Sequence, residues 1–397
     1  MKSTLLLSVL VVASVSLPAA DGSNTARTNA STRIFSSRGE PNDNAYFPIA
    51  VWLQSPRNAA RYQAAGINLY VGLWRGPTAA QLDELRKARM PVICDQNRFA
   101  LEHKDDPIIA AWMHGDEPDN AQSLPSGQGY GPPILPERIV ADYQRLRAAD
   151  PSRPVLLNLG QGVAWDNYIG RGVRRNHPED YPEYLKGCDI ASFDIYPVVH
   201  DSPQIAGKLE YVARGVERLQ DWARGEKPVW SCIECTHISN PKAKATPQQV
   251  RSEVWMALIR GARGLIYFVH QFKPDFKEAA LLDDPSMLTA VTKINRQIRE
   301  LAPVLNSPTD TEGLKVQVSG TDGMIAAILK RRGDVLHVFA VNLRNQPARS
   351  RFELRAAPAG AKVAVLEESR EVPCESGSFS DEFAPYAVHL YRVSAAK

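Results

Sequence analysis

The sequence predicts an α/β protein, a (β/α)₈ TIM barrel followed by a small all-β sandwich domain. Three observations predict this fold. From about residue 47, short apolar runs alternate with longer helical patterns, as in parallel β–α units. Eight such units fit into about 260 residues, which is the size of a closed barrel. After Pro303 only short strand-like runs remain, separated by Gly, Pro and Asp, which is typical of a sandwich.

Each barrel strand is predicted from a short apolar run, and each long helix from a periodic segment that follows it. Thr246 and Pro247 form a typical helix start, an N-cap followed by Pro. A doubly wound open sheet is the alternative, but eight units without a Gly-rich phosphate turn favour closure. The predicted strands are 47–53, 67–73, 91–94, 108–114, 155–159, 190–196, 228–234 and 264–269, and the predicted helices are 56–65, 78–88, 136–149, 204–223, 247–260 and 285–302.

The barrel is expected to span residues 45–306 and the sandwich residues 311–397. A domain of about 80 residues is expected mainly to pack against the barrel. Glycan binding is the alternative function of this domain, but no exposed aromatic cluster favours it. The runs that predict its strands are 316–318, 324–329, 335–341, 351–354, 362–366 and 387–393.

The N-terminus resembles an export signal. Lys2 precedes an uncharged apolar stretch, and Pro18-Ala19-Ala20 offers small residues for cleavage. A membrane anchor is the alternative, but the stretch falls short of the about 20 apolar residues that span a bilayer. We therefore expect a signal peptide over 1–20, a flexible leader over 21–44, and a secreted or periplasmic protein with no membrane span in its mature chain.

Charge and cysteine content exclude several classes of protein. Lys and Arg exceed Asp and Glu by 47 − 44 = 3 without a long basic run, which argues against nucleic acid as a partner. Cys232 and Cys235 have C-x-x-C spacing, but no second pair completes a zinc site, so buried thiols are favoured over metal or redox chemistry. No cofactor or metal is expected, and nothing indicates an oligomeric state.

Catalytic side chains of such barrels come from the carboxyl ends of the strands. Glu234 ends an apolar strand, and Glu117 follows another on a different side of the barrel. Burying an unpaired carboxylate costs several kcal/mol, so a glutamate at the end of an apolar strand is expected to have a function. The alternative is a structural carboxylate that accepts hydrogen bonds from a loop. Two carboxylates that face one pocket are what glycosidic cleavage needs.

Over the barrel, about two-thirds of the chain, the sequence resembles the clan A glycoside hydrolases. By position, this resemblance implies that Glu117 is the acid/base and Glu234 the nucleophile of a retaining hydrolase that cleaves a β-linked oligo- or polysaccharide. It also implies that Tyr196 hydrogen-bonds the nucleophile. The order of barrel then sandwich is common in that clan as well.

Two departures from the clan pattern keep other mechanisms open. The clan usually has Asn before the acid/base, where this chain has Asp116, and often Trp at the end of strand eight, where it has Phe268, His270 and Phe272. The Asp116–Glu117 pair resembles N-acetylhexosaminidases, in which the substrate's own acetamide attacks and Glu234 has no nucleophilic role. A non-catalytic glycan-binding barrel is a further alternative.

Other side chains at the predicted strand ends are candidates for sugar contacts. A cluster of His200, His237 and His270 could suggest a zinc-dependent hydrolase, but their spacing does not support one. The arginines at positions 171, 174 and 175 could bind an acidic glycan, although a solvated surface loop is the favoured interpretation of Arg171, Arg174 and Arg175. The candidate substrate-binding residues are Asp116, Asp95, Asn158, Trp74, Trp165, Asp194, His237 and His270.

Overall fold

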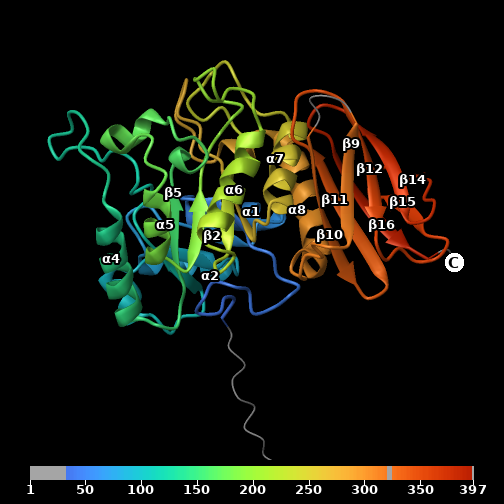
Figure 1. Cartoon of the computed structure of the whole chain (residues 1–397). Coiled ribbons are helices and arrows are strands. Elements are labelled where there is room, and N and C mark those ends of the chain that lie inside the picture. Colours follow the sequence, from blue (N-terminus) through green and yellow to red (C-terminus); the bar gives the residue numbers. More distant parts are fainter. Residues whose placement is uncertain (1–32, 320–323, 396–397) are drawn as a thin grey trace, which may run out of the picture. The chain divides into compact units, whose positions relative to one another are not determined.

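The computed structural model describes residues 33–319 and 324–395, so the predicted signal peptide over 1–20 lies outside the described residues. Eight parallel strands close into a barrel in chain order, and β8 pairs with β1. The predicted barrel is confirmed (Figure 1). Its strands are β1 (Ile49–Trp52), β2 (Leu69–Val71), β3 (Val92–Asp95), β4 (Ile109–Met113), β5 (Val155–Leu159), β6 (Ile190–Phe193), β7 (Val229–Glu234) and β8 (Gly264–Phe268).

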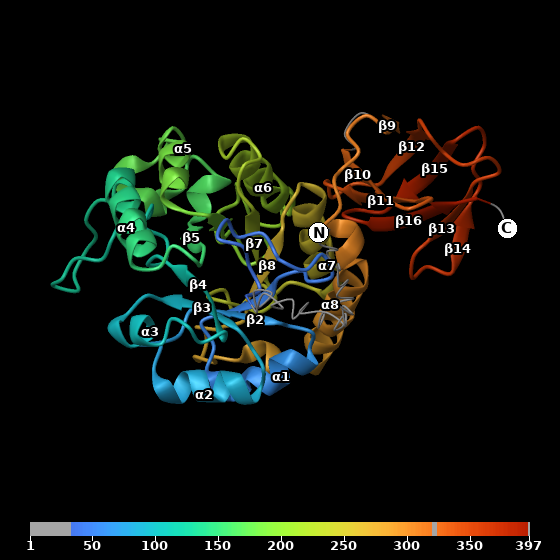
Figure 2. The ribbon, with the colours of Figure 1, turned by 90° about the horizontal axis from the view of Figure 1, so that it is seen from below.

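Helices surround these strands, as the view in Figure 2 shows. Capping boxes start two of them, Thr78 with Gln81 and Thr246 with Gln249, and Pro247 occupies the first turn as predicted. The short helices α3 and α5 were not predicted, because five residues are too few to show a helical period. The helices are α1 (Ala59–Ala64), α2 (Ala79–Lys87), α3 (Arg98–Glu102), α4 (Pro136–Ala149), α5 (Asp180–Tyr184), α6 (Glu210–Trp222), α7 (Pro247–Ile259) and α8 (Pro285–Leu305).

The barrel strands are buried on both faces, which explains why their sequences are continuous apolar runs. One face of the strands fills the interior with side chains such as Ile93, Leu156 and Trp230, and the other packs under the helices. The interior is therefore a packed core, and a ligand of the barrel has to bind beyond the strand ends.

Residues 33–44 form a turn that closes the amino-terminal end of the barrel, which corrects the expectation of a flexible leader up to residue 44. Phe35 is buried, with its ring centroid 5.8 Å from that of Trp230. Gly39 has φ +88°, and a Cβ there would lie 2.3 Å from Ile190 Cγ1, so this close approach requires glycine. Ile34 and Phe35, which pack on the same core, were the apolar signals for this packing in a segment otherwise rich in polar residues.

The C-terminal region is all-β, as predicted. It has a five-stranded sheet in the order β10-β11-β16-β13-β14 and a three-stranded sheet in the order β15-β12-β9. Strands β14 and β15 were not predicted, because both are rich in polar residues. The strands are β9 (Leu314–Ser319), β10 (Ile325–Arg332), β11 (Val335–Asn342), β12 (Ala348–Leu354), β13 (Lys362–Val365), β14 (Arg370–Val372), β15 (Ser378–Phe383) and β16 (Val388–Ser394).

Helix α7 joins the barrel to the five-stranded sheet. Arg251 donates a hydrogen bond to Val388 O at 3.0 Å, and Ser252 Oγ donates one to Tyr386 O at 2.6 Å. The Trp255 and Phe339 ring centroids lie 5.1 Å apart in the same interface. The β domain therefore packs on the barrel wall.

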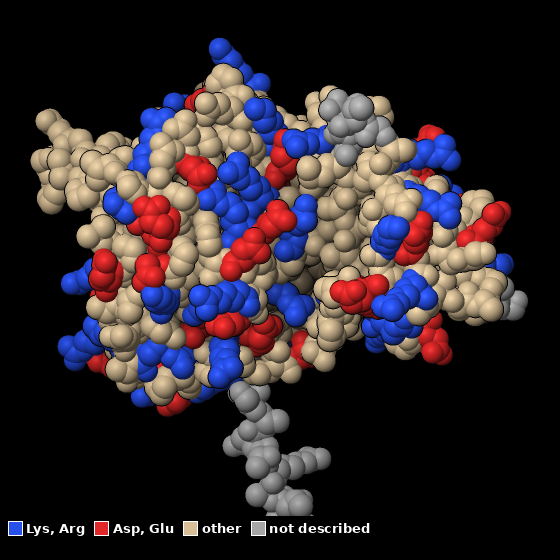
Figure 3. Space-filling model, in the orientation of Figure 1, with Lys and Arg blue, Asp and Glu red and all other residues tan. Residues whose placement is uncertain are grey.

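Two surface properties bear on partners. Lys and Arg are interspersed with Asp and Glu on the face shown in Figure 3. Within residues 33–319 and 324–395, none of the helices combines the length and the apolar character that a membrane crossing needs.

Candidate active site

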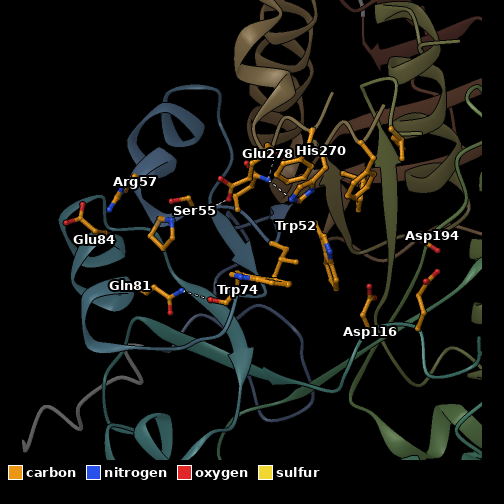
Figure 4. Close-up of a pocket in the computed structure, with 18 of the residues that line it drawn as sticks. Trp52, Ser55, Arg57, Trp74, Gln81, Glu84, Asp116, Asp194, His270 and Glu278 are labelled. Atoms are coloured by element: carbon orange, nitrogen blue, oxygen red, sulfur yellow. Dashed lines mark hydrogen bonds between the residues drawn. The ribbon is translucent and has the colours of Figure 1, made fainter. Parts of the chain in front are cut away.

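A cavity of about 1560 Å³ opens at the carboxyl ends of the barrel strands. Its lining comes from the ends of β1, β2, β4, β5, β6, β7 and β8 and the loops after them, and from helix α2. Asp116 and Asp194 lie at one side, Trp52 and Trp74 in the middle, and Arg57 and Glu84 at the other side (Figure 4). The cavity is thus elongated, with acidic groups at one side and aromatic rings beside them.

Glu117 lies in the cavity directly after β4 and has a φ of +43°. Such a φ is uncommon for a residue with a side chain and is typical of positions where the surrounding structure holds a functional group in place. The Glu117 carboxyl lies at hydrogen-bonding distance from that of Asp194. Burial, followed by the charges of Asp194 and Asp116, raises the pKa of Glu117 well above its ordinary value. Glu117 can therefore hold a proton near neutral pH.

Asp194 and Tyr196 lie two residues apart just beyond β6, and both line the cavity. Burial raises the pKa of Asp194. The Tyr196 ring packs against Phe268 with centroids 5.2 Å apart. The Tyr196 hydroxyl and the Glu117 carboxyl both lie close enough to the Asp194 carboxyl to interact with it, although neither Asp194 Oδ1 nor the Tyr196 hydroxyl has a well-formed hydrogen bond among the described residues. An acceptor and a hydroxyl that are only loosely paired thus occur together in the cavity lining.

Asp116 is held by a residue that the sequence predicted as a sugar contact. Asn158 Nδ2 donates to Asp116 Oδ1 at 2.9 Å, and Asn158 Oδ1 accepts from Ser192 Oγ at 2.8 Å. Asn158 does not line the cavity, so it orients Asp116 instead of meeting a ligand. Burial of the carboxyl raises the pKa of Asp116 to about 6.

Glu234 does not line this cavity, in contrast to the position expected for it as a nucleophile. It is 0% exposed, and its carboxylate accepts hydrogen bonds from Val198 N at 2.6 Å and Val199 N at 3.1 Å. Its carboxyl also lies at hydrogen-bonding distance from Glu253 of α7. The donors that bind it belong to the loop after β6, and its other neighbour belongs to α7, so its carboxylate is held by these groups and Tyr196 is not its partner.

Aromatic rings form two walls of the cavity. Trp74 is 68% exposed on a turn whose carbonyl, Trp74 O, accepts a hydrogen bond from Gln81 Nε2 at 2.9 Å. Opposite it in the lining, the ring of His270 stacks on that of Phe272 at an interplanar angle of 6°. Burial lowers the pKa of His270, so this ring is neutral near pH 7. Exposed rings such as those of Trp74 and Phe272 can stack on the faces of sugars, whereas His270 itself is buried behind Phe272.

Besides Asn158, three further predicted contact residues lie outside the cavity lining. Trp165 packs on Tyr168 and His200, His237 Nδ1 lies 2.8 Å from Ala243 O, and Asp95 is exposed at the end of β3. Trp165 and His237 are thus involved in loop packing.

The arginine-rich loop after β5 is held together by its own charges. Arg171 is 1% exposed and donates to Asp180 Oδ2 at 2.8 Å and to Asp119 O at 3.2 Å. Arg174 also binds Asp180, and Arg175 donates to Asn167. None of these arginines lines the cavity. The loop therefore has a structural explanation that does not involve an acidic glycan.

Several lining residues were missed by the sequence analysis. Trp52, Gln54 and Ser55 end β1 and follow it, so the strand-end rule that found Glu117 could have found them. Glu278 lies in the loop between β8 and α8, and its carboxylate accepts from Ser55 N at 2.6 Å; no pattern in the sequence indicated it.

In the described part of the chain, no three His, Cys, Asp or Glu side chains are grouped so that they could hold a metal ion. The three histidines that the sequence suggested as a cluster contact different residues. His200 pairs with Gln161, whereas His270 contacts Gln54.

A scan against protein-family models finds no match, and a search of curated protein sequences finds none either. Solved structures do match. A catalytic mutant of a GH42 β-galactosidase from G. stearothermophilus gives a TM-score of 0.55 at 8% identity, covering 91% of this chain and 99% of that chain. AmyP in complex with maltose gives a TM-score of 0.50 at 9% identity, covering 89% of this chain and 98% of that chain. At such identities the likeness shows the fold, and the activity has to be argued from the site.

Proposed function

We propose that this protein is a retaining glycoside hydrolase that cleaves β-linked glycans containing 2-acetamido sugars. Glu117 is the general acid. The raised pKa of Glu117 keeps it protonated near neutral pH, as the donor to a glycosidic oxygen must be.

The observation that carries the substrate class is the position of Asp194 and Tyr196 next to each other in the cavity lining, without a well-formed hydrogen bond between them. An acetamide placed there would donate its N–H to Asp194 and accept at its carbonyl from the Tyr196 hydroxyl. Buried polar groups in folded proteins are almost always hydrogen-bonded, so a loosely paired acceptor and hydroxyl favour a ligand that offers both a donor and an acceptor.

The spacing of the carboxyl groups also supports participation of the substrate. A carboxylate nucleophile lies about 5–5.5 Å from the acid, and the base of an inverting enzyme about 6.5–9.5 Å away. Asp194 is already at hydrogen-bonding distance from Glu117, and Glu234 is outside the cavity. This arrangement favours attack by the acetamide oxygen over attack by a carboxylate.

The reaction then has two steps. Glu117 donates its proton to the glycosidic oxygen while the acetamide oxygen bonds to the anomeric carbon, and the aglycone leaves as an alcohol. Glu117, now ionised, removes a proton from water, whose oxygen attacks the anomeric carbon and breaks its bond to the acetamide oxygen. Two inversions give net retention.

Trp74 and the His270–Phe272 wall are proposed to stack on neighbouring sugar units, so the substrate is an oligo- or polysaccharide. We also propose that the protein is exported, on the pattern of its first 20 residues. Mass spectrometry of the protein from its source cell tests export, and an intact Met1 would contradict it.

The test of the activity compares two aryl β-glycosides that differ only in a 2-acetamido or 2-hydroxyl group. We expect turnover of the acetamido substrate, retention by proton NMR of the first-formed sugar, and inhibition by a thiazoline analogue of the cyclic intermediate. Equal turnover of the hydroxyl substrate would instead favour Asp194 or Asp116 as nucleophile. Binding of glycans without any turnover would indicate a non-catalytic barrel.

A further inference from the structure

Two glutamates meet inside the barrel wall, outside the cavity. Glu234 ends β7 and Glu253 lies in α7, and both are 0% exposed. Their carboxyl groups lie at hydrogen-bonding distance from each other. Neither oxygen of Glu253 has an N–H or hydroxyl partner among the described residues. The nearest other titratable side chain, Cys235, is neutral because burial raises its pKa.

Two buried negative charges in contact are strongly unfavourable, so this pair must hold a proton. The surroundings decide which glutamate holds it. The two backbone N–H groups of Val198 and Val199 stabilise the ionised form of Glu234. Glu253 has no such donor, so the proton resides on Glu253, which donates it in a hydrogen bond to Glu234.

The two N–H groups belong to the segment that carries the cavity residues. Strand β6 ends at Phe193, and Asp194 and Tyr196 follow it. Asp194 N still donates to Leu159 O at 3.1 Å, but beyond that point the Glu234 carboxylate is the acceptor for Val198 and Val199. Glu234 therefore fixes the far end of a segment whose near end is fixed by β5.

We propose that Glu253 and Glu234 are positioning residues for the cavity: protonated Glu253 holds Glu234 as a doubly accepting carboxylate, and Glu234 holds Asp194 and Tyr196 where they meet the substrate. The kinetic part of this inference rests on the proposed function. The structural part does not.

The test uses three variants and one control in the full chain. Glu253→Leu removes the donor to Glu234. Glu253→Gln keeps a donor N–H without a titrating proton. Glu234→Gln can accept from only one of the two backbone N–H groups. The matched control, Ser252→Ala, removes another buried hydrogen bond of α7, to Tyr386 O, and so reports general damage to this helix.

Hydrogen–deuterium exchange at the amides of Val198 and Val199 is the structural readout. We expect faster exchange in Glu253→Leu and Glu234→Gln, slow exchange in Glu253→Gln, and slow exchange at these two amides in Ser252→Ala even if its melting temperature falls. If Glu253→Leu does not fold, Glu234→Gln decides. Unchanged exchange in the folded variants overturns the inference, whatever the activity of the protein.

The kinetic readout separates a positioning role from a merely structural one. We expect kcat to fall by up to about 100-fold in Glu253→Leu with KM changed far less, because small displacements of reacting groups have effects of this size. Glu253→Gln should recover most of the loss. Faster exchange together with a wild-type enzyme that hydrolyses no glycoside would contradict the proposed function and leave the structural part supported.

Discussion

Two pairs of carboxyl groups lie at hydrogen-bonding distance in the described part of the chain, and their surroundings differ. Both members of the Glu117–Asp194 pair line a large cavity. In the Glu234–Glu253 pair, Glu234 accepts hydrogen bonds from two backbone N–H groups and does not line that cavity. The comparison teaches that a buried carboxyl at a strand end indicates a ligand site only where open space accompanies it.

The largest effect on activity is expected for Glu117→Gln, which changes the Glu117–Asp194 pair of the cavity. An amide cannot supply the proton to the leaving oxygen, so we expect kcat to fall by about 100-fold to 10,000-fold. Turnover of an aryl glycoside with a good leaving group should fall less, because such a group needs little protonation. Glu300→Gln, an exposed change on α8, is the control. Normal turnover by Glu117→Gln would exclude Glu117 as the acid.

Asp194→Asn is expected to change the pH profile of the enzyme. Burial is the main cause of the raised Glu117 pKa, and the negative charge of Asp194 is the next. An amide carries no charge, so the pKa of Glu117 should fall, and the alkaline limb of kcat/KM, which requires protonated Glu117, should move to lower pH. A limb that stays in place or moves to higher pH would show that Asp194 does not act on Glu117.

The Glu234–Glu253 pair should make the folding stability of the protein depend on pH. The pKa of Glu253 is raised in the folded protein by burial and by Glu234, so the unfolded chain loses this proton at lower pH than the folded one. Stability should fall as the pH rises above the ordinary Glu pKa, by about 1.4 kcal/mol for each unit of the shift. Denaturant unfolding of Glu253→Gln should give a flatter dependence. The groups facing the pair are Cys235 and, beyond it, Lys244 and Asp284, none of which Glu253→Gln alters.

The smallest effect is expected for Trp74→Ala at the aromatic wall. Loss of a stacking ring should weaken oligosaccharide binding by about 1 kcal/mol, or about five-fold in KM, and affect aryl monosaccharides less. Tyr130→Ala is the control, because Tyr130 is 75% exposed but does not line the cavity. Equal changes for short and long substrates would argue against a sugar subsite at Trp74.

The sequence was sufficient for the barrel because each strand is a buried apolar run between turn residues, and the Thr246–Pro247 helix start lies where it was predicted. The strand-end rule also found Asp116, Glu117, Asp194 and Tyr196. It could not place Glu234 correctly, because the direction of that side chain depends on Val198, Val199 and Glu253. These partners come together only in the folded chain.

The same limit applies to the arginine loop. The charges at positions 171, 174 and 175 favour a solvated loop over a site for an acidic glycan in the sequence, whereas in the structure Arg171 is buried and both Arg171 and Arg174 bind Asp180. Strands β14 and β15 were missed for a different reason, since polar edge strands lack the apolar alternation on which the prediction depends.

The buried ring of Phe35 limits where the chain can be cut during maturation or by proteases. A cut before Arg33 leaves the turn of residues 33–44 in place beneath the strands. A cut after Phe35 would remove the ring that covers Trp230 and would open the barrel floor to water. A cut near residue 20 would therefore leave the folded core intact, whereas the loss of about fifteen further residues, up to and including Phe35, would produce a shorter and aggregation-prone protein.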